Sequence, residues 1–260
     1  MSLTFDEFKE EAIKILNLNL NGYKIKRVKR RTDSLMRRKK IKDYDEFVNL
    51  LKNDISCRTA YLNHLTINTS EFFRNPENFE YLRENILPDL KEKHQKVRLW
   101  SAPCSNGSEP YTLAIILNEL GYDSSQFEIK ASDIDSNILD TAREGIYNKN
   151  SLKNVPDDII SRYFEKLPDD KYKIKRNISK DISFEKKDLI KESYDKNWNL
   201  ILCRNFFIYL TKEVKGKLIQ KFVEALKPDG YLFLGNTEFI FKPGEYNLKK
   251  EHSSFYKKLD

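Results

Sequence analysis

The segment from Val97 to Tyr111 constrains the fold most, because it joins a buried strand, a turn of small residues and a helix start. An almost continuous apolar run predicts the strand, and it comprises Val97, Leu99, Trp100 and Ala102. Ser105 to Ser108 interrupt the strand, and Glu109-Pro110 open a helix whose first turn tolerates proline, since the missing N–H is not needed there. This order of elements places backbone amides where a nucleotide-like cofactor can bind.

A second apolar strand is predicted for Phe127 to Ala131, and Asp133 and Asp135 follow at its carboxyl end. An acid at that place in a βαβ unit can accept hydrogen bonds from both hydroxyls of a ribose. With the preceding segment, this indicates a site for an adenosine-type ligand. Asp133 can instead merely cap the next helix, although Asp135 is the better candidate for that cap.

Composition and cysteine usage narrow the class of protein. The chain has 260 residues, 39% of them hydrophobic, enough for one substantial core and a small second domain. Apolar runs such as Ala114 to Leu117 are far shorter than the roughly 20 residues that cross a bilayer, so membrane insertion is excluded. Met1 to Leu16 lacks the layout of a cleavable signal, so we expect a cytoplasmic protein. The scattered Cys57, Cys104 and Cys203 predict free thiols and no metal site.

Residues 1 to about 68 show two apolar stripes at helical spacing and predict an all-helical domain. Between the stripes, the segment from Asn21 to Lys42 carries eleven basic residues against the single acid Asp33. A solvated helix face is the ordinary explanation for such a run. Eleven bases exceed what solubility requires, so we expect the segment to attract an acidic surface. Tyr23 is its only aromatic residue, so the segment lacks the interleaved aromatic side chains that stack on bases. This disfavours nucleic acid as the partner.

The rest of the chain alternates strand and helix patterns. They cover Val97–Ala102, Pro110–Leu120, Phe127–Ala131, Ser136–Arg143, Asn199–Cys203, Glu213–Leu226 and Tyr231–Leu234. This alternation predicts an α/β fold with a parallel, doubly wound sheet, to which Ser253 to Lys258 can add an edge strand.

Short alternating segments at Tyr172 to Lys175 and Ile182 to Phe184 predict a small antiparallel β insertion at about 146–187. We therefore expect a helical domain at 1–68, a linker and leading helix at 69–95, and a Rossmann-like domain with the insertion at 96–260.

Four sequence blocks then occur in order along nearly the whole chain. They are NTSEFFR at 68–74, WSAPCSNGSEPY at 100–111, ASDID at 131–135 and CRNFFIYL at 203–210. As a set they resemble the CheR-type chemotaxis receptor methyltransferases, which use S-adenosylmethionine to methylate glutamate side chains of chemoreceptors. The resemblance implies a protein-glutamate O-methyltransferase with S-adenosylhomocysteine as its product, no metal, and methyl esters formed in chemotaxis adaptation.

The resemblance also assigns site residues. It implies cofactor contacts from Asn68, Ser70, Arg74, Glu109, Asp133, Asp188, Leu189, Arg204 and Asn205. We expect Arg74 and Tyr209 to shape the reaction, Arg74 by pairing with a carboxylate and Tyr209 by orienting the acceptor. Otherwise, Arg74 would form an interdomain salt bridge and Tyr209 would be a plain core aromatic.

The chain departs from the family pattern at several positions. Pro103 stands where Gly or Ala is usual and removes one backbone N–H from the turn under the cofactor, a change that can weaken cofactor affinity. Ser70 replaces Thr and keeps the hydroxyl, Asp188 replaces Asn, and Gly235 to Glu238 replace a Gly-His-Ser-Glu block.

The expected partner is the cytoplasmic helical region of a chemoreceptor, bound by a monomeric enzyme. The docking residues would be basic side chains of the helical domain: Lys24, Arg27, Arg30, Arg31, Arg37 and Arg38. Two alternatives stay open, a nucleic-acid methyltransferase and a non-catalytic module that binds S-adenosylmethionine. Against the first, Asn205 to Ile208 stand where an enzyme that methylates base amino groups would carry Asn/Asp-Pro-Pro-Tyr.

Overall fold

The computed structural model describes residues 2–16, 18, 20–66 and 70–260, and it divides into two compact units. The first unit comprises Met1–Asn68 and Tyr209–Lys215, and the second comprises Thr69–Ile208 and Gly216–Asp260. The segment Tyr209–Lys215 therefore belongs with the helical unit, although it follows a strand of the second unit in sequence. Sequence patterns gave no sign of this return.

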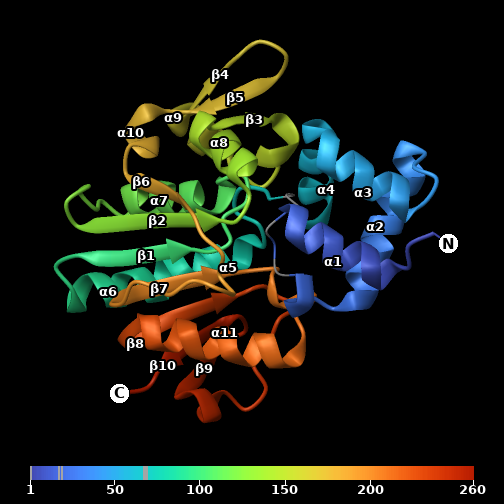
Figure 1. Ribbon diagram of the computed structural model, residues 1–260. Helices are drawn as coiled ribbons and strands as arrows, with labels where there is room; N and C mark the ends of the chain where they lie inside the picture. Colours follow the sequence, from blue (N-terminus) through green and yellow to red (C-terminus); the bar gives the residue numbers. More distant parts are fainter. Residues whose placement is uncertain (1, 17, 19, 67–69) are drawn as a thin grey trace. The chain divides into compact units, whose positions relative to one another are not determined.

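The first unit is all-helical, as expected (Figure 1). Its elements are α1 (Phe5–Leu16), η1 (Leu20–Gly22), α2 (Ile25–Lys39), α3 (Tyr44–Asn53) and α4 (Ile55–Thr66). Aromatic rings form its core: the centroids of Phe8 and Phe47 lie 5.1 Å apart, and those of Phe47 and Tyr61 lie 4.9 Å apart. Asp43 caps α3 by accepting a hydrogen bond from the N–H of Glu46 at 2.9 Å.

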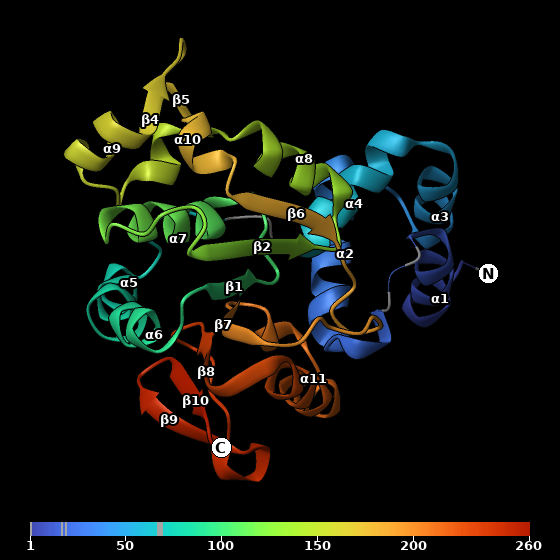
Figure 2. The ribbon, with the colours of Figure 1, turned by 90° about the vertical axis from the view of Figure 1, so that its left-hand side faces the viewer.

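The second unit is built on a seven-stranded sheet in the order β6-β2-β1-β7-β8-β10-β9 (Figure 2). Its strands are β1 (Val97–Ser101), β2 (Phe127–Asp133), β6 (Ile182–Lys186), β7 (Trp198–Cys203), β8 (Leu226–Leu234), β9 (Leu248–His252) and β10 (Phe255–Lys258). The first five strands in this order are parallel, and β10 pairs antiparallel with both β8 and β9. The predicted doubly wound sheet is confirmed. The expectation of an edge strand at Ser253 to Lys258 was wrong, since β10 lies between β8 and β9, and β9 forms the edge.

Helices cover both faces of this sheet (Figures 1 and 2). They are α5 (Pro76–Tyr81), η2 (Leu82–Ile86), α6 (Leu87–Lys93), α7 (Ser108–Glu119), α8 (Ser136–Glu144) and α11 (Lys212–Ala225), with short turns η4 (Phe207–Tyr209) and η5 (Pro243–Tyr246) in the loops. Alternation along β1 explains the two-sided burial. Leu99 joins the apolar core that includes Leu113 of α7, whereas the ring of Trp100 lies 5.7 Å from that of Phe222 in α11.

The β insertion is a separate three-stranded antiparallel sheet in the order β3-β5-β4. The whole insertion comprises β3 (Ile146–Asn148), η3 (Lys149–Leu152), α9 (Asp157–Tyr163), β4 (Phe164–Lys166), β5 (Lys171–Ile174) and α10 (Arg176–Ser179). The expectation for Ile182 to Phe184 was wrong, since these residues lie in β6 and pair with β2 at the edge of the main sheet. A half-buried edge strand and a hairpin strand have the same alternating pattern, so the pattern does not identify the partner.

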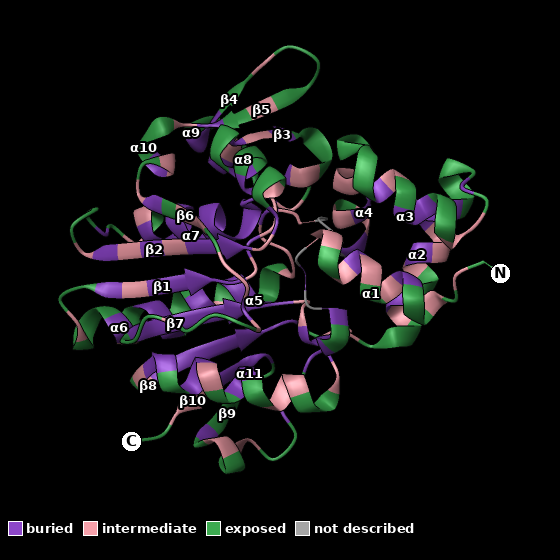
Figure 3. Cartoon of the chain, viewed as in Figure 1, coloured by how far each residue is buried: buried purple, intermediate pink, exposed green. Residues whose placement is uncertain are grey.

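Burial follows this division (Figure 3): the central strands β1 and β7 are almost wholly buried, while most of β5 in the insertion is exposed or intermediate. Among the described parts of the chain, no helix combines the length and the apolar character needed to traverse a bilayer.

Candidate functional site

The strand order reverses between β1 and β7, and this is where open α/β sheets bind ligands, beyond the carboxyl ends of the strands. After β1 the chain passes through the cis Ala102-Pro103 peptide to Ser105, whose φ is +50°. After β7 it reaches Asn205, whose φ is +60°. Non-glycine residues in this left-handed region are strained and concentrate at functional sites.

Gly107, with φ +84°, precedes α7. A Cβ built there would lie 2.9 Å from Cβ of Ala142, so glycine permits the close approach of this turn to α8. The predicted turn between the first strand and the helix is thus present, and α7 begins at Ser108, one residue before Glu109-Pro110.

Asp133 ends β2 at the same edge and is only 4% exposed. Its carboxylate accepts hydrogen bonds from the N–H groups of Ser105 at 2.9 Å and of Asp135 at 3.1 Å. Burial raises the pKa of Asp133 to about 6. Asp135 is the cap of α8 through the N–H of Asn137, as predicted, so Asp133 does not serve that purpose.

Glu109 and Arg204 form a buried ion pair across the reversal point. They are 8% and 7% exposed, and Nη1 of Arg204 lies 3.2 Å from Oε2 of Glu109. The other oxygen of Glu109 accepts a hydrogen bond from the hydroxyl of Ser101 at 2.7 Å. Nη2 of Arg204 donates to the carbonyl of Arg74 at 2.6 Å and to Oδ1 of Asn75 at 3.0 Å. Arg204 therefore fixes two other parts of the site.

The Ser70–Arg74 segment is tied down by its aromatic residues. Phe72 is fully buried, and its ring meets those of Tyr147 and Phe164 of the insertion edge-on, with centroids 4.8 and 5.0 Å away. Phe73 and Asn75, on either side of Arg74, have φ of +49° and +63°. Arg74 thus lies between two residues whose backbone is left-handed.

The N-terminal end of this motif is only partly described. The carbonyl of Ser70 accepts a hydrogen bond from Nδ2 of Asn106 at 3.4 Å, which joins the motif to the turn after β1. Asn68, another expected contact, lies outside the described residues.

Asp188 and Leu189 lie in the turn after β6. Oδ1 of Asp188 accepts hydrogen bonds from the N–H groups of Ile190 at 2.9 Å and Lys191 at 3.1 Å. The Lys221 amine of α11 donates to the Leu189 carbonyl at 3.0 Å and to two further carbonyls of the turn. The sequence did not predict this contact, because Lys221 occupies an ordinary position in an amphipathic helix.

Glu238 is a further buried carboxylate, and the sequence analysis gave it no role. It is 4% exposed and accepts hydrogen bonds from the N–H groups of Asn205 at 2.7 Å, Gly235 at 2.9 Å and Ile208 at 3.2 Å. The only available signal was its place in the block that departs from the family's Gly-His-Ser-Glu pattern.

Cys104 and Cys203 are buried thiols, and Cys57 is also unpaired and buried, as the sequence predicted. Burial raises the pKa of Cys104 and of Cys203 well above the ordinary value. They are therefore unreactive packing residues.

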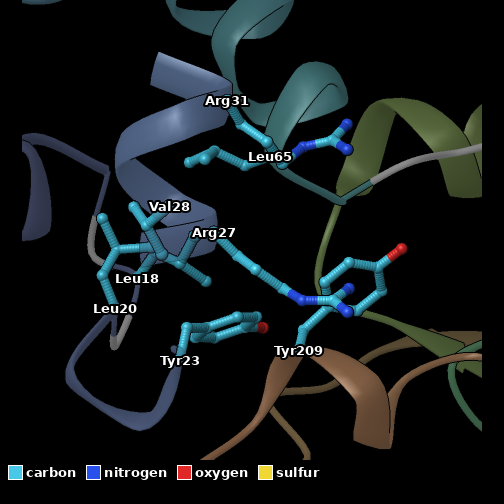
Figure 4. Close-up of a pocket in the computed structure, with 8 residues that line it drawn as sticks. All are labelled: Leu18, Leu20, Tyr23, Arg27, Val28, Arg31, Leu65 and Tyr209. Carbon is cyan, nitrogen blue, oxygen red and sulfur yellow. The ribbon is translucent and has the colours of Figure 1, made fainter. Parts of the chain in front are cut away.

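Tyr209 belongs to the helical unit, where it lines a small cavity (Figure 4). The guanidinium of Arg27 lies 5.4 Å from the centroid of its ring, and its carbonyl accepts a hydrogen bond from the N–H of Lys24 at 2.8 Å. Arg31 lines the same cavity and donates to the carbonyl of His64. The cavity measures about 20 Å³, which is room for a water molecule and not for an organic ligand.

The basic residues of α2 fall into two groups. Val28, Leu35 and Met36 bury one face of the helix, and the basic side chains on the rest of it differ in exposure. Lys24, Arg30, Arg37 and Arg38 are exposed, whereas Arg27 and Arg31 are half-buried. The expected docking set thus contains four exposed and two half-buried side chains.

A larger cavity of about 250 Å³ lies elsewhere in the second unit. Apolar side chains of α7 and of the insertion, such as Ile115 and Ile159, form part of its wall. None of the expected cofactor contacts lines it, so it is separate from the carboxyl-edge site.

The groups at the carboxyl edge suit an adenosyl ligand with a charged tail. Asp133 supplies buried acceptor oxygens at the strand end where ribose hydroxyls are held in related folds. The Glu109–Arg204 pair supplies an acceptor for an ammonium, and the Gly107 turn brings backbone close to the site. The donors and acceptors present therefore fit S-adenosylmethionine.

Comparison with known proteins agrees with this chemistry. The profile described as "CheR methyltransferase, SAM binding domain" matches residues 68–255, and that described as "CheR methyltransferase, all-alpha domain" matches residues 3–66. A "Chemotaxis protein methyltransferase" of Listeria innocua is 37% identical over 93% of this chain and 92% of its own length. One of Borreliella burgdorferi is 34% identical over 99% of this chain and 96% of its own length.

A further relative of the same name, from Salmonella typhimurium, is 33% identical over 75% of this chain and 69% of its own length. Both family models thus match this chain, the all-alpha domain before the S-adenosylmethionine-binding domain, and together they span nearly all of the sequence. This chain belongs to the CheR methyltransferase family and carries the family's S-adenosylmethionine-binding domain.

Proposed function

We propose that the protein methylates glutamate side chains of chemoreceptors to give methyl esters, in chemotaxis adaptation. The observation that carries this proposal is the buried set of Asp133, Glu109 and Arg204 at the reversal point of the sheet in a member of the CheR family. The names of the relatives point to the chemotaxis substrate. A nucleic-acid methyltransferase and a non-catalytic binding module are both disfavoured by this membership.

The reaction requires little acid–base chemistry from the protein. S-adenosylmethionine supplies a methyl group on a cationic sulfur, and its transfer to a carboxylate oxygen leaves a neutral thioether and an ester without moving a proton. An unperturbed glutamate titrates near pH ~4.3 and is already ionised at neutral pH. The work of the site is to hold the acceptor oxygen in line with the methyl group and to exclude water.

The cofactor is proposed to be held by groups of matched chemistry. Asp133 accepts from the ribose hydroxyls, Glu109 from the methionyl ammonium, and Asp188 from the adenine amino group, with Leu189 beside the base. Asn68, Ser70 and Asn205 complete the contacts. Arg204 is almost completely buried, and its Nη1 and Nη2 already donate hydrogen bonds to Glu109 and to the turn at Arg74. We therefore propose that Arg204 supports these two parts of the cofactor site.

Arg74 and Tyr209 are proposed to act on the acceptor. The planar guanidinium of Arg74 can pair with a carboxylate through two parallel hydrogen bonds, which lysine cannot do. The Tyr209 hydroxyl orients the incoming carboxylate. In support of this role, the carbonyl of Arg74 accepts a hydrogen bond from Nη2 of Arg204 at 2.6 Å, which anchors the turn that carries Arg74.

The decisive test is transfer of radiolabelled methyl from S-adenosylmethionine to the cytoplasmic region of a chemoreceptor. A carboxyl ester releases labelled methanol in mild alkali, whereas a methylated nitrogen does not. We expect base-labile label on glutamate, and alkali-stable label would contradict the proposal. The Arg74→Ala variant should remain folded yet transfer no methyl group.

Docking on the receptor is proposed to use Lys24, Arg30, Arg37 and Arg38, the four exposed members of the expected set. Replacing the three arginines with Ala should raise KM for the receptor several-fold at low salt and leave kcat nearly unchanged. The effect should shrink at high ionic strength, because screening shortens the range of such attraction. The matched control removes three exposed lysines elsewhere, Lys242, Lys249 and Lys250. An equal rise in KM for the control would show that only net charge matters.

A further inference from the structure

The loop after β7 is held by one side chain from a distant part of the sequence. Glu238 lies 33 residues beyond Asn205 and is almost completely buried. Its oxygen Oε2 accepts from the N–H groups of Asn205 and Gly235, and Oε1 accepts from that of Ile208. Three backbone donors thus converge on one side chain.

Such convergence matches an ionised acceptor. A carboxylate offers two acceptor oxygens and no donor, whereas the side-chain amide of glutamine offers one acceptor oxygen and two donors, so a carboxylate suits three converging N–H groups. The loop that it holds contains Asn205, whose backbone is left-handed with φ +60°, a conformation that few non-glycine residues adopt. The hydrogen bond from the Asn205 N–H to Glu238 helps to hold the loop in this conformation.

The fit around the carboxylate is tight. A Cβ built on Gly235 would lie 2.8 Å from Oε2 of Glu238, 2.9 Å from Nδ2 of Asn205 and 3.0 Å from the Asn205 nitrogen. Gly235 has no positive φ, so its lack of a side chain serves this close approach and not a special turn. The end of β8 and the Asn205 loop are thereby packed against each other.

We propose that Glu238 is a positioning residue for methyl transfer: it fixes the Arg204–Ile208 backbone so that Asn205 meets the cofactor and Arg204 keeps its contacts with Glu109 and Arg74. This rests on the proposed function, because Asn205 is a cofactor contact only by that proposal. Glu238 itself touches neither cofactor nor acceptor in this role.

The principal test is Glu238→Gln, which keeps the shape but turns one acceptor oxygen into a donor facing N–H groups. We expect the Kd for S-adenosylhomocysteine, measured by calorimetry on folded protein, to rise about tenfold, which corresponds to about 1.4 kcal/mol and to the loss of roughly one hydrogen bond to the cofactor. The amide proton resonances of Asn205 and Gly235 should also move, because they lose a charged acceptor.

Glu128→Gln is the matched control. Glu128 is a partly buried carboxylate that receives two hydrogen bonds from Arg98, at the opposite end of the strands. The control should lose some stability and keep the Kd of the wild type. If folded Glu238→Gln also keeps that Kd and the wild-type kcat, Glu238 is only structural and the inference is overturned.

A second variant covers the case in which Glu238→Gln does not fold. Gly235→Ala keeps every charge and pushes the carboxylate away from the loop, so it should raise the Kd in the same direction; an unchanged Kd there overturns the inference. Failure of the wild type to bind S-adenosylhomocysteine would instead refute the proposed function. The amide resonances would still report whether Glu238 holds the loop.

Discussion

The two ends of the parallel strands carry similar side chains in different surroundings. At the amino end, Arg98 pairs with Glu128 through Nε and Nη2 at 3.1 and 3.0 Å, and both side chains keep contact with solvent. At the carboxyl end, Arg204 pairs with Glu109 at 3.2 Å, and both are almost fully covered. Only the second pair is costly to keep, because buried charges lose their hydration. The burial of the charged pair Glu109 and Arg204, despite their loss of hydration, indicates that the carboxyl end of the sheet carries the function.

The largest expected difference between the two ends comes from removing the arginine. Arg204→Met leaves the Glu109 carboxylate buried without its partner, so the free energy of unfolding should fall by about 3–5 kcal/mol. Urea unfolding at neutral pH measures this change. Adding Glu109→Gln should recover part of the loss, and a fall below about 1 kcal/mol would mean that the pair is not buried in solution.

Glycines at the two ends should also differ. Gly107 at the carboxyl end and Gly121 at the amino end both have positive φ, where an L-residue costs about 1–2 kcal/mol. A Cβ on Gly107 also approaches Ala142 to 2.9 Å, whereas a Cβ on Gly121 meets nothing within 4 Å. Gly107→Ala should therefore destabilise by about 2 kcal/mol or more and Gly121→Ala by about 1 kcal/mol. Equal losses in thermal unfolding would contradict the close packing at Gly107.

Protonation of Asp133 gives a pH test of the carboxyl end. If ribose hydroxyls donate to the ionised carboxylate, the Kd for S-adenosylhomocysteine should rise as pH falls below about 6, approaching tenfold per pH unit. The free energy of unfolding should have the opposite pH dependence. The pKa of Asp133 in the folded protein lies above its value in the unfolded chain, so the contribution of Asp133 to stability is greatest below about pH 3.8 and is lost as pH rises through about 6. A Kd that is flat from pH 7.5 to 5 would remove Asp133 from the cofactor site.

The smallest effect is expected at the amino end. Arg98→Met removes a partly exposed ion pair and a guanidinium that lies 4.2 Å from the ring centroid of Trp198. The loss of stability should be about 1 kcal/mol, and cofactor affinity should not change. A tenfold weaker Kd in this variant would abolish the distinction between the two ends.

Local chemistry made part of this site predictable. The strand, small-residue turn and helix start around Glu109-Pro110 appear in sequence order, so their conformations follow from neighbouring residues. The cap at Asp135 is likewise a local rule, and the structure confirms it. Four short motifs were enough to indicate the family, because each is contiguous.

Pairings across long stretches of sequence were not predictable. Glu109 and Arg204 are 95 residues apart, and nothing in their local patterns says that β1 and β7 are neighbours. The hydrogen bonds of Glu238 to the loop after β7 and of Lys221 to the turn after β6 depend on the same order of strands. The error at Ile182 to Phe184 has the same source, since alternation fixes the face of a strand and not its partner.

Because Tyr209–Lys215 belong to the helical unit, the protein cannot be truncated between the two units without loss of native contacts. Tyr23 and Leu210 form an isolated antiparallel bridge, and the N–H of Thr211 donates to the carbonyl of Gly22 at 3.0 Å. A chain shortened to begin at residue 69 would leave these backbone groups of Leu210 and Thr211 with no protein partners. In such a shortened enzyme, Tyr209, the proposed acceptor-orienting residue, would lose its neighbours of the helical unit, and the basic helix α2 would be missing.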